Sequence, residues 1–145
     1  MCYTLLLSTT SIEDLSAQSN ELVRFSRELP SIADVKKLEH PNRWYVGSKS
    51  GCSCTFRHLH SIELGFGEPV DWYPEESEEI EATLQLIGII RRLIESGESV
   101  DCVDAWEHQN MHPIAKATLE VDLCKVSDQE FRFFENHHFE FKNAI

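Results

Sequence analysis

Apolar residues follow a helical period over the longest such stretch of the chain, from Pro74 to Gly97. At about 100° per residue, the leucines and isoleucines of this stretch spread over more than half of the helix circumference. Pro74 suits a first helical position, and Gly97 can adopt the left-handed conformation that closes a helix. A helix that is apolar over so wide an arc is mostly buried. The pattern therefore predicts one long, mostly buried helix over residues 74–97, packed against a sheet.

Shorter stretches have the alternation and the β-branched or aromatic content of strands. The predicted strands are 2–9, 22–29, 43–47, 52–60, 100–106, 117–126 and 138–141, the last as an edge strand. The Ser- and Gly-rich turn at 48–51 indicates a hairpin between the third and fourth of them. Capping-box patterns, Thr10 with Glu13 and Ser127 with Glu130, predict short helices over 11–19 and after Ser127.

These elements predict one globular domain over residues 1–145, without an internal repeat or a linker. Its class is α+β, with an antiparallel or mixed sheet packed on the helix of residues 74–97. The order of the elements, which begins β-α-β-β and returns through α-β, is compatible with a ferredoxin-like arrangement.

Composition adds the expectation of a cytoplasmic protein. The chain has 41% hydrophobic and 26% charged residues, as is ordinary for a globular domain. It has no apolar run near the ~20 residues of a membrane span and no basic region typical of a signal peptide. Five cysteines, an odd number, are expected to be reduced thiols in this compartment.

Charge narrows the class of partner. The net charge of −12 argues against binding of nucleic acid, because contacts to a phosphate backbone need neutralising Lys and Arg. No Lys or Arg lies between Arg57 and Arg91, whereas acidic residues are frequent from Glu63 to Glu81. Such a segment attracts a cation or a basic protein. A solvated surface that keeps the protein soluble is the other interpretation of the same residues.

The segment before the long helix combines these acids with aromatic side chains. Carboxylates held near aromatic residues form a plausible ligand site or partner-binding surface. The residues expected to contact a partner are Glu68, Asp71, Trp72, Tyr73, Glu75 and Glu76. An ordered loop whose aromatic residues cap the sheet would show the same pattern. We expect a binding or regulatory domain, rather than an enzyme, that engages a basic protein or self-associates.

A second hypothesis centres on thiols and imidazoles. Zinc prefers the side chains that the segment from residue 52 to residue 60 supplies, and Cys102 is a more distant candidate ligand. In one unbroken strand, however, Cys52 and His60 would lie roughly 26 Å apart, which is too far for a shared ion. A zinc site therefore requires a turn near Cys54 or ligands from elsewhere. The candidate ligands are Cys52, Cys54, His58, His60 and Cys102.

The same segment could supply a cysteine nucleophile. Such a thiol needs a lowered pKa and a base within about 3 Å. The candidate catalytic residues are Cys52, Cys54, Arg57 and His58. Cys54 and His58 would be roughly 13 Å apart in one strand, so a catalytic pair would have to join different strands. Small buried side chains are the ordinary role of such cysteines.

Overall fold

Six strands of the chain form one mixed sheet in the order β2-β3-β1-β5-β8-β6. The computed structural model describes residues 3–30, 33–49, 52–59, 65–106 and 117–142. The strands are Tyr3–Thr9 (β1), Val23–Ser26 (β2), Asn42–Ser48 (β3), His58–Leu59 (β4), Val100–Trp106 (β5), Ala117–Asp122 (β6), Phe133–Phe134 (β7) and His137–Lys142 (β8). The α-helix α1 is Ser77–Glu95, and two short 3-10 helices are Leu15–Gln18 (η1) and Ala33–Lys37 (η2).

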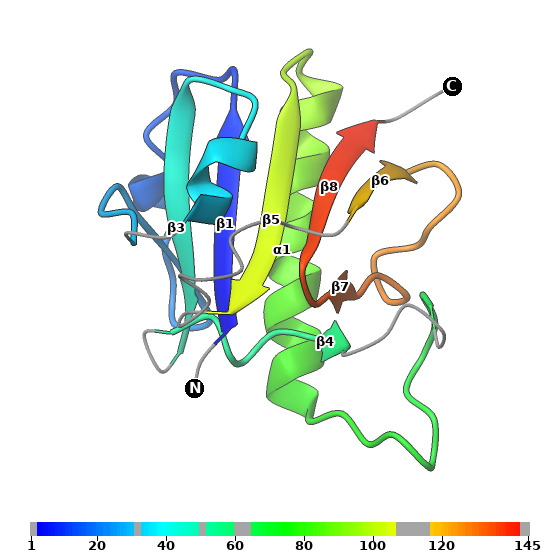
Figure 1. The fold of residues 1–145 in the computed structure, drawn as a ribbon. Helices are drawn as coiled ribbons and strands as arrows, with labels where there is room; N and C mark the ends of the chain where they lie inside the picture. The colour runs from blue at the N-terminus through cyan, green and yellow to red at the C-terminus, as the bar shows by residue number, and fades with distance from the viewer. Residues whose placement is uncertain (1–2, 31–32, 50–51, 60–64, 107–116, 143–145) are drawn as a thin grey trace.

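The helix α1 packs along one face of this sheet, as Figure 1 shows. Its inward side chains include Leu86, Ile90 and Leu93, which join one apolar cluster with Leu5 and Leu7 of β1. On the opposite face, Leu6, Leu38, Val103 and Ala105 form a much smaller apolar cluster beside η2. That second face, which α1 does not cover, is called the open face below. Because it has little apolar cover, polar side chains of the strands can gather on it.

The predicted helix over residues 74–97 is confirmed, with shorter ends. It begins after Pro74, because Glu76 caps it and the Glu79 carboxylate accepts a 2.8 Å hydrogen bond from the Glu76 backbone N–H. At its end, Gly97 has a φ of 96°. The backbone N–H of Glu98 donates to the Leu93 carbonyl at 3.0 Å, as in a glycine-closed helix end.

The hairpin prediction over residues 43–60 is wrong. Residues 53–54 form a turn, residues 55–56 a bend, and among the described residues of the predicted strand only His58–Leu59 is extended. This strand, β4, pairs in parallel with β7 rather than with β3. The physical reason is a serine: Ser53 turns inward, accepts a 2.9 Å hydrogen bond from the Leu5 N–H and donates to the Val46 carbonyl at 2.5 Å. These two hydrogen bonds hold the segment around Ser53 against β1 and β3.

The predictions of two short helices are also wrong. The predicted helix over residues 11–19 shrinks to η1, and the one after Ser127 is replaced by turns that lead into β7. The last strand, β8, lies between β5 and β6 and is not an edge. A mixed sheet of six strands with one α-helix is an α+β fold, and the ferredoxin-like topology is not confirmed. In the part of the chain that the structure describes, no helix is long and apolar enough to cross a membrane.

Candidate metal centre

A row of three carboxylates crosses neighbouring strands. Asp101 of β5 lies opposite Glu140 of β8, and Glu140 lies opposite Glu120 of β6. Residues that are directly opposite in a sheet point to the same face, and like charges in such positions destabilise the sheet. In the same register, Ser8 of β1 lies opposite Asp101 and places this row on the open face. The row concentrates negative charge at one place and so favours a bound cation or proton there.

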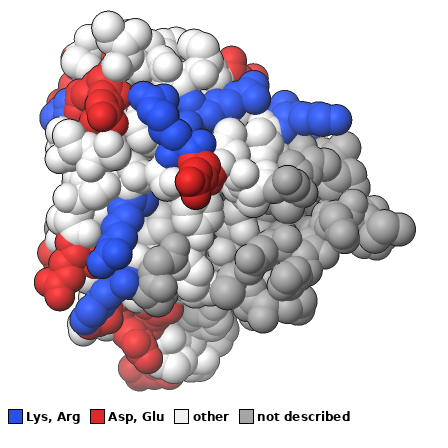
Figure 2. All heavy atoms as spheres, turned by 90° about the vertical axis from the view of Figure 1, so that its left-hand side faces the viewer, with Lys and Arg blue, Asp and Glu red and all other residues white. Residues whose placement is uncertain are grey.

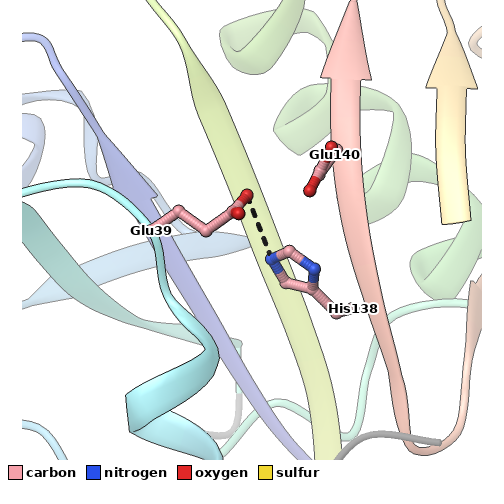
Figure 3. Close-up of side chains that lie close together, drawn as sticks. All are labelled: Glu39, His138 and Glu140. Atoms are coloured by element: carbon pink, nitrogen blue, oxygen red, sulfur yellow. Dashed lines mark ion pairs between the residues drawn. The ribbon is translucent and has the colours of Figure 1, made fainter. Parts of the chain in front are cut away.

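The imidazole of His138 lies next to this row on β8, and the residue is only 2% exposed. Its Nδ1 atom lies 3.1 Å from the Thr118 hydroxyl, and its Nε2 atom lies 2.7 Å from Oδ2 of Asp101. The threonine fixes the orientation of the ring from one side. The other nitrogen is therefore directed at the carboxylates, as Figure 3 shows.

Asp101 ties the segment after η2 to the sheet. Its carboxylate is fully buried and accepts a hydrogen bond from the Ser8 hydroxyl and one from the Glu39 backbone N–H at 2.9 Å. The Ser8 hydroxyl in turn accepts from the His40 backbone N–H at 3.1 Å. These bonds hold Glu39 over the open face, where its carboxylate lies 3.8 Å from Nε2 of His138.

Glu39 and Glu140 meet above the imidazole. One ligand atom from each of Glu39, His138 and Glu140 lies within 4.8 Å of the other two. Hydrogen bonding to the neighbouring Glu39 carboxyl raises the pKa of Glu140 above its usual value, and desolvation adds to the effect. Among the described residues, no Lys or Arg forms an ion pair with Glu39, Asp101 or Glu140. Lys142 pairs instead with Glu120, at 3.6 Å.

This arrangement can hold a divalent cation. Zinc is bound by imidazole nitrogen and carboxylate oxygen at about 2.0–2.2 Å, so ligand atoms around one ion lie a few ångströms apart. Glu39 is exposed and Glu140 is half-buried, so their carboxylates can rotate onto an ion, while His138 is held in place. Binding at Nε2 requires the proton of that nitrogen to leave. The residues that could hold a metal are thus Glu39, His138 and Glu140, with Asp101 beside them.

Arg57 and Glu75, two residues predicted to act at a site, belong to a buried ion-pair network. The Glu75 carboxylate accepts hydrogen bonds from Nε of Arg57 at 2.6 Å and from Nη2 of Arg132 at 2.7 Å. The Glu75 side chain is only 4% exposed. Arg57 also donates to the Gln129 carbonyl at 2.6 Å. Both oxygens of the Glu75 carboxylate, which the sequence predicts to contact a partner, are therefore occupied inside the protein. The Arg57 guanidinium is likewise paired inside the protein, with the Glu75 carboxylate and the Gln129 carbonyl.

Hydrogen bonds to groups other than a thiol occupy both ring nitrogens of His58. Its Nδ1 lies 2.7 Å from Oδ2 of Asp104, and its Nε2 lies 2.6 Å from the Ser53 carbonyl. Burial by itself lowers the pKa of His58, but the Asp104 carboxylate and the Ser53 carbonyl raise it above the usual value. Both nitrogens are thus occupied, and neither is directed at a thiol.

The candidate cysteines do not share one site. Cys52 lines a groove on the open face, Cys54 follows in the turn, and Cys102 is buried beneath α1. Burial raises the pKa of the Cys102 thiol well above its usual value, which keeps it protonated. The ligand clusters found among the described residues contain no cysteine. His60 lies outside the described residues.

The predicted partner segment forms a loop with one very exposed aromatic side chain. Trp72 is 73% exposed, and Glu68, Asp71 and Glu76 are exposed as well. Tyr73 is half-buried, and its hydroxyl donates a 2.9 Å hydrogen bond to the His58 carbonyl. Glu63, which begins the acidic segment, lies outside the described residues. Four of the six predicted residues are thus exposed, whereas the side chain of Glu75 is buried.

The carboxylate–histidine cluster was missed by sequence reasoning. Its members lie far apart in the chain, and its register depends on β8 lying between β5 and β6, which no local pattern reveals. A partial signal was present in the alternation of the last strand, which places His138 and Glu140 on one face. The chain matches no protein-family model, no curated protein and no solved structure.

Proposed function

We propose that this chain is a binding domain whose open sheet face holds one divalent metal ion at Glu39, His138 and Glu140. The observation that carries the proposal is the meeting of two carboxylates over a buried, oriented imidazole nitrogen. In the absence of a cation, Glu39 and Glu140 repel each other unless a proton lies between them. A divalent ion would remove this repulsion and use all three groups as ligands.

The ligand set favours zinc over magnesium or calcium. Imidazole suits zinc and neighbouring transition metals, whereas magnesium and calcium prefer oxygen ligands alone. The Thr118 hydroxyl on Nδ1 of His138 resembles the outer partners that orient metal-bound histidines. The domain would present this ion, with open coordination positions, on the face that η2 leaves uncovered beside β8.

Calorimetric titration of the metal-free protein with zinc tests the proposal. We expect one ion per chain and a loss of affinity of at least about tenfold when Glu39→Gln and Glu140→Gln are combined, because ligand charge is removed. The matched control is Glu95→Gln with Glu98→Gln, which removes the same charge elsewhere. Equal affinities in both variants would refute the site.

A second variant distinguishes the proposed site from a zinc site at the cysteines. Cys52→Ser combined with Cys54→Ser removes the thiols of the alternative zinc site and leaves Glu39 and Glu140 in place. On the present proposal this variant still binds one ion with unchanged affinity. Loss of the ion in this variant alone would move the site to the thiols and support the alternative of a thiol- or metal-dependent function at Cys52 and Cys54.

A second candidate function is the capture of a basic protein segment by the loop that carries Trp72. The observation that favours it is an exposed tryptophan held on a rigid base, since Arg132 donates to the Glu68 carbonyl at 2.9 Å and to Glu75. Aromatic anchors surrounded by complementary charge are typical of protein interfaces. The exposed carboxylates of Glu68, Asp71 and Glu76 would attract Lys and Arg of the partner.

Tryptophan fluorescence tests this second candidate. A Lys- and Leu-containing peptide should shift the emission of Trp72 and lose that effect at high salt, whereas a peptide with Glu in place of Lys should not. Trp72→Phe removes the signal and identifies its source. An equal response to both peptides would refute the electrostatic mechanism. A change with protein concentration alone would indicate self-association instead.

A further inference from the structure

A groove lies on the open face and shares no residue with the metal centre. This groove has a volume of about 530 Å³ and crosses β1, β3 and β2. Its lining residues include Thr4, Arg24, Glu28, Leu29, Tyr45 and Cys52. Gly47 also lines it and lies opposite Arg24 in the sheet, so the middle of the floor is backbone without a side chain. Small-molecule sites have volumes of about 300–1,000 Å³.

The groove contains two opposite charges that do not neutralise each other. Within the described part of the chain, neither the Arg24 guanidinium nor the Glu28 carboxylate forms an ion pair or a side-chain hydrogen bond. The Thr4 hydroxyl also has no hydrogen-bond partner there, although the residue is only 2% exposed. The hydroxyl is therefore available to a ligand in the groove.

The surrounding surface favours an anionic group despite the net charge of −12. Six of the 13 Lys and Arg residues fall between Arg24 and Lys49, in the segments that form this side of the molecule. Figure 2 shows Lys and Arg side chains across the side of the molecule that holds β2 and β3, with Asp and Glu side chains next to some of them. Glu28 is the acid that lines the groove itself, where it can receive a cationic group. Leu29, Pro30 and Tyr45 supply apolar contact between the charges.

We propose that this groove binds a small zwitterion with the chemistry of a free α-amino acid that has an apolar side chain. The ligand carboxylate would pair with Arg24 and accept from the Thr4 hydroxyl. Its ammonium group would pair with Glu28, and its side chain would lie against Leu29 and Tyr45. This inference is independent of the proposed metal centre, because the two sites share no residue.

Amide chemical shifts of the full chain, followed during titration with leucine or phenylalanine, test this inference. We expect saturable shifts around Gly47 with the free amino acid. Leucinamide, which lacks the carboxylate, and N-acetylleucine, which lacks the ammonium group, should each bind at least about tenfold more weakly, because each leaves one charged group unpaired. Equal binding of all three compounds, or no saturable shift, would overturn the proposal.

Matched variants assign the two charges. Arg24→Gln and Glu28→Gln should each weaken leucine binding by about tenfold or more, while Lys125→Gln and Glu95→Gln, which remove the same charges elsewhere, should leave it unchanged. The four residues are exposed, so the variants are expected to fold. Bound leucine should also slow alkylation of Cys52 without affecting the exposed Cys124. Unchanged leucine affinity in both groove variants would contradict the assignment.

Discussion

The Thr118 hydroxyl lies 3.1 Å from Nδ1 of His138, on the side of the imidazole opposite the carboxylates. The two residues face each other across the parallel pair of β6 and β8. This relationship decides which nitrogen faces the carboxylates, because a hydroxyl that occupies Nδ1 leaves Nε2 on the side of Asp101, at 2.7 Å, and of Glu39, at 3.8 Å. Among the described residues the threonine hydroxyl forms a hydrogen bond to the histidine alone, so it acts through the histidine.

Thr118→Val should therefore weaken zinc binding without abolishing it. The isosteric valine removes the hydroxyl that orients the imidazole, and loss of such an outer partner weakens metal affinity about 10- to 100-fold. Calorimetric titration of both proteins measures the change. Thr10→Val, which removes an exposed hydroxyl that bonds to Glu98 and Ser99 and to no candidate ligand, is the control and should bind zinc like the wild type. Equal affinity in all three proteins would exclude this positioning role.

Glu75 should be one of the most important residues for stability. Glu75→Gln removes the negative charge between Arg57 and Arg132 and leaves two buried guanidinium groups without a counter-charge. Breaking a buried ion pair in this way costs about 3–5 kcal/mol. Glu78→Gln removes an exposed pair with Lys49 and should cost less than about 1 kcal/mol. Urea unfolding of the two variants measures the contrast, and similar losses would contradict it.

Stability should fall as the pH rises above about 6.5, because His58 is better stabilised when charged. Its pKa is raised in the folded protein by Asp104 and the Ser53 carbonyl, against the opposing effect of burial. The imidazole is stacked on Tyr3 at 4.0 Å. A raised folded pKa gives stability that is present below the unfolded value of about 6.5 and lost through the folded value.

The free energy of unfolding, measured at several pH values in this window, tests that sign. Asp104→Asn removes the carboxylate that favours the charged imidazole, so the variant should show a smaller slope with pH. A stability that rises with pH in the wild type, or an equal slope in the variant, would contradict the assignment.

Two glycines of the helix region should respond to alanine in opposite directions. Gly88 lies within α1 on its exposed side, and an added Cβ meets nothing within 4 Å. Gly88→Ala should stabilise the protein by about 0.5–1 kcal/mol, since alanine loses less backbone entropy. Gly97 has equal space but a φ of 96°, so Gly97→Ala should destabilise it by about 1–2 kcal/mol. Thermal unfolding measures both shifts, and changes of the same sign would refute this reasoning.

The sequence predicts the long elements, because their own residues carry the hydrophobic pattern. The helix with Leu86 and Ile90, and the strands of Leu5 and Val103, follow from burial patterns that local residues determine. The turn at Ser53 could not be predicted, because its hydrogen bonds to Leu5 and Val46 join distant segments.

The candidate site depends even more on distant segments. The alternation of the last strand predicts that His138 and Glu140 share a face. Glu39 comes from another segment, and Asp101 from another strand that the sheet order places beside them. Of the residues predicted to contact a partner, Trp72 is exposed, whereas the Glu75 side chain is buried, because Arg57 and Arg132 converge on it only in the fold.

The nitrogen chemical shifts of the histidine side chains, recorded before and after one equivalent of zinc, test the central claim most directly. The account predicts that Nε2 of His138 changes from a protonated to a metal-bound nitrogen, while Nδ1 keeps its bond to Thr118. The side chains of His58 and His137 should remain unchanged. Zinc binding that leaves both nitrogens of His138 unperturbed, or no binding at all, would contradict a metal centre at Glu39, His138 and Glu140.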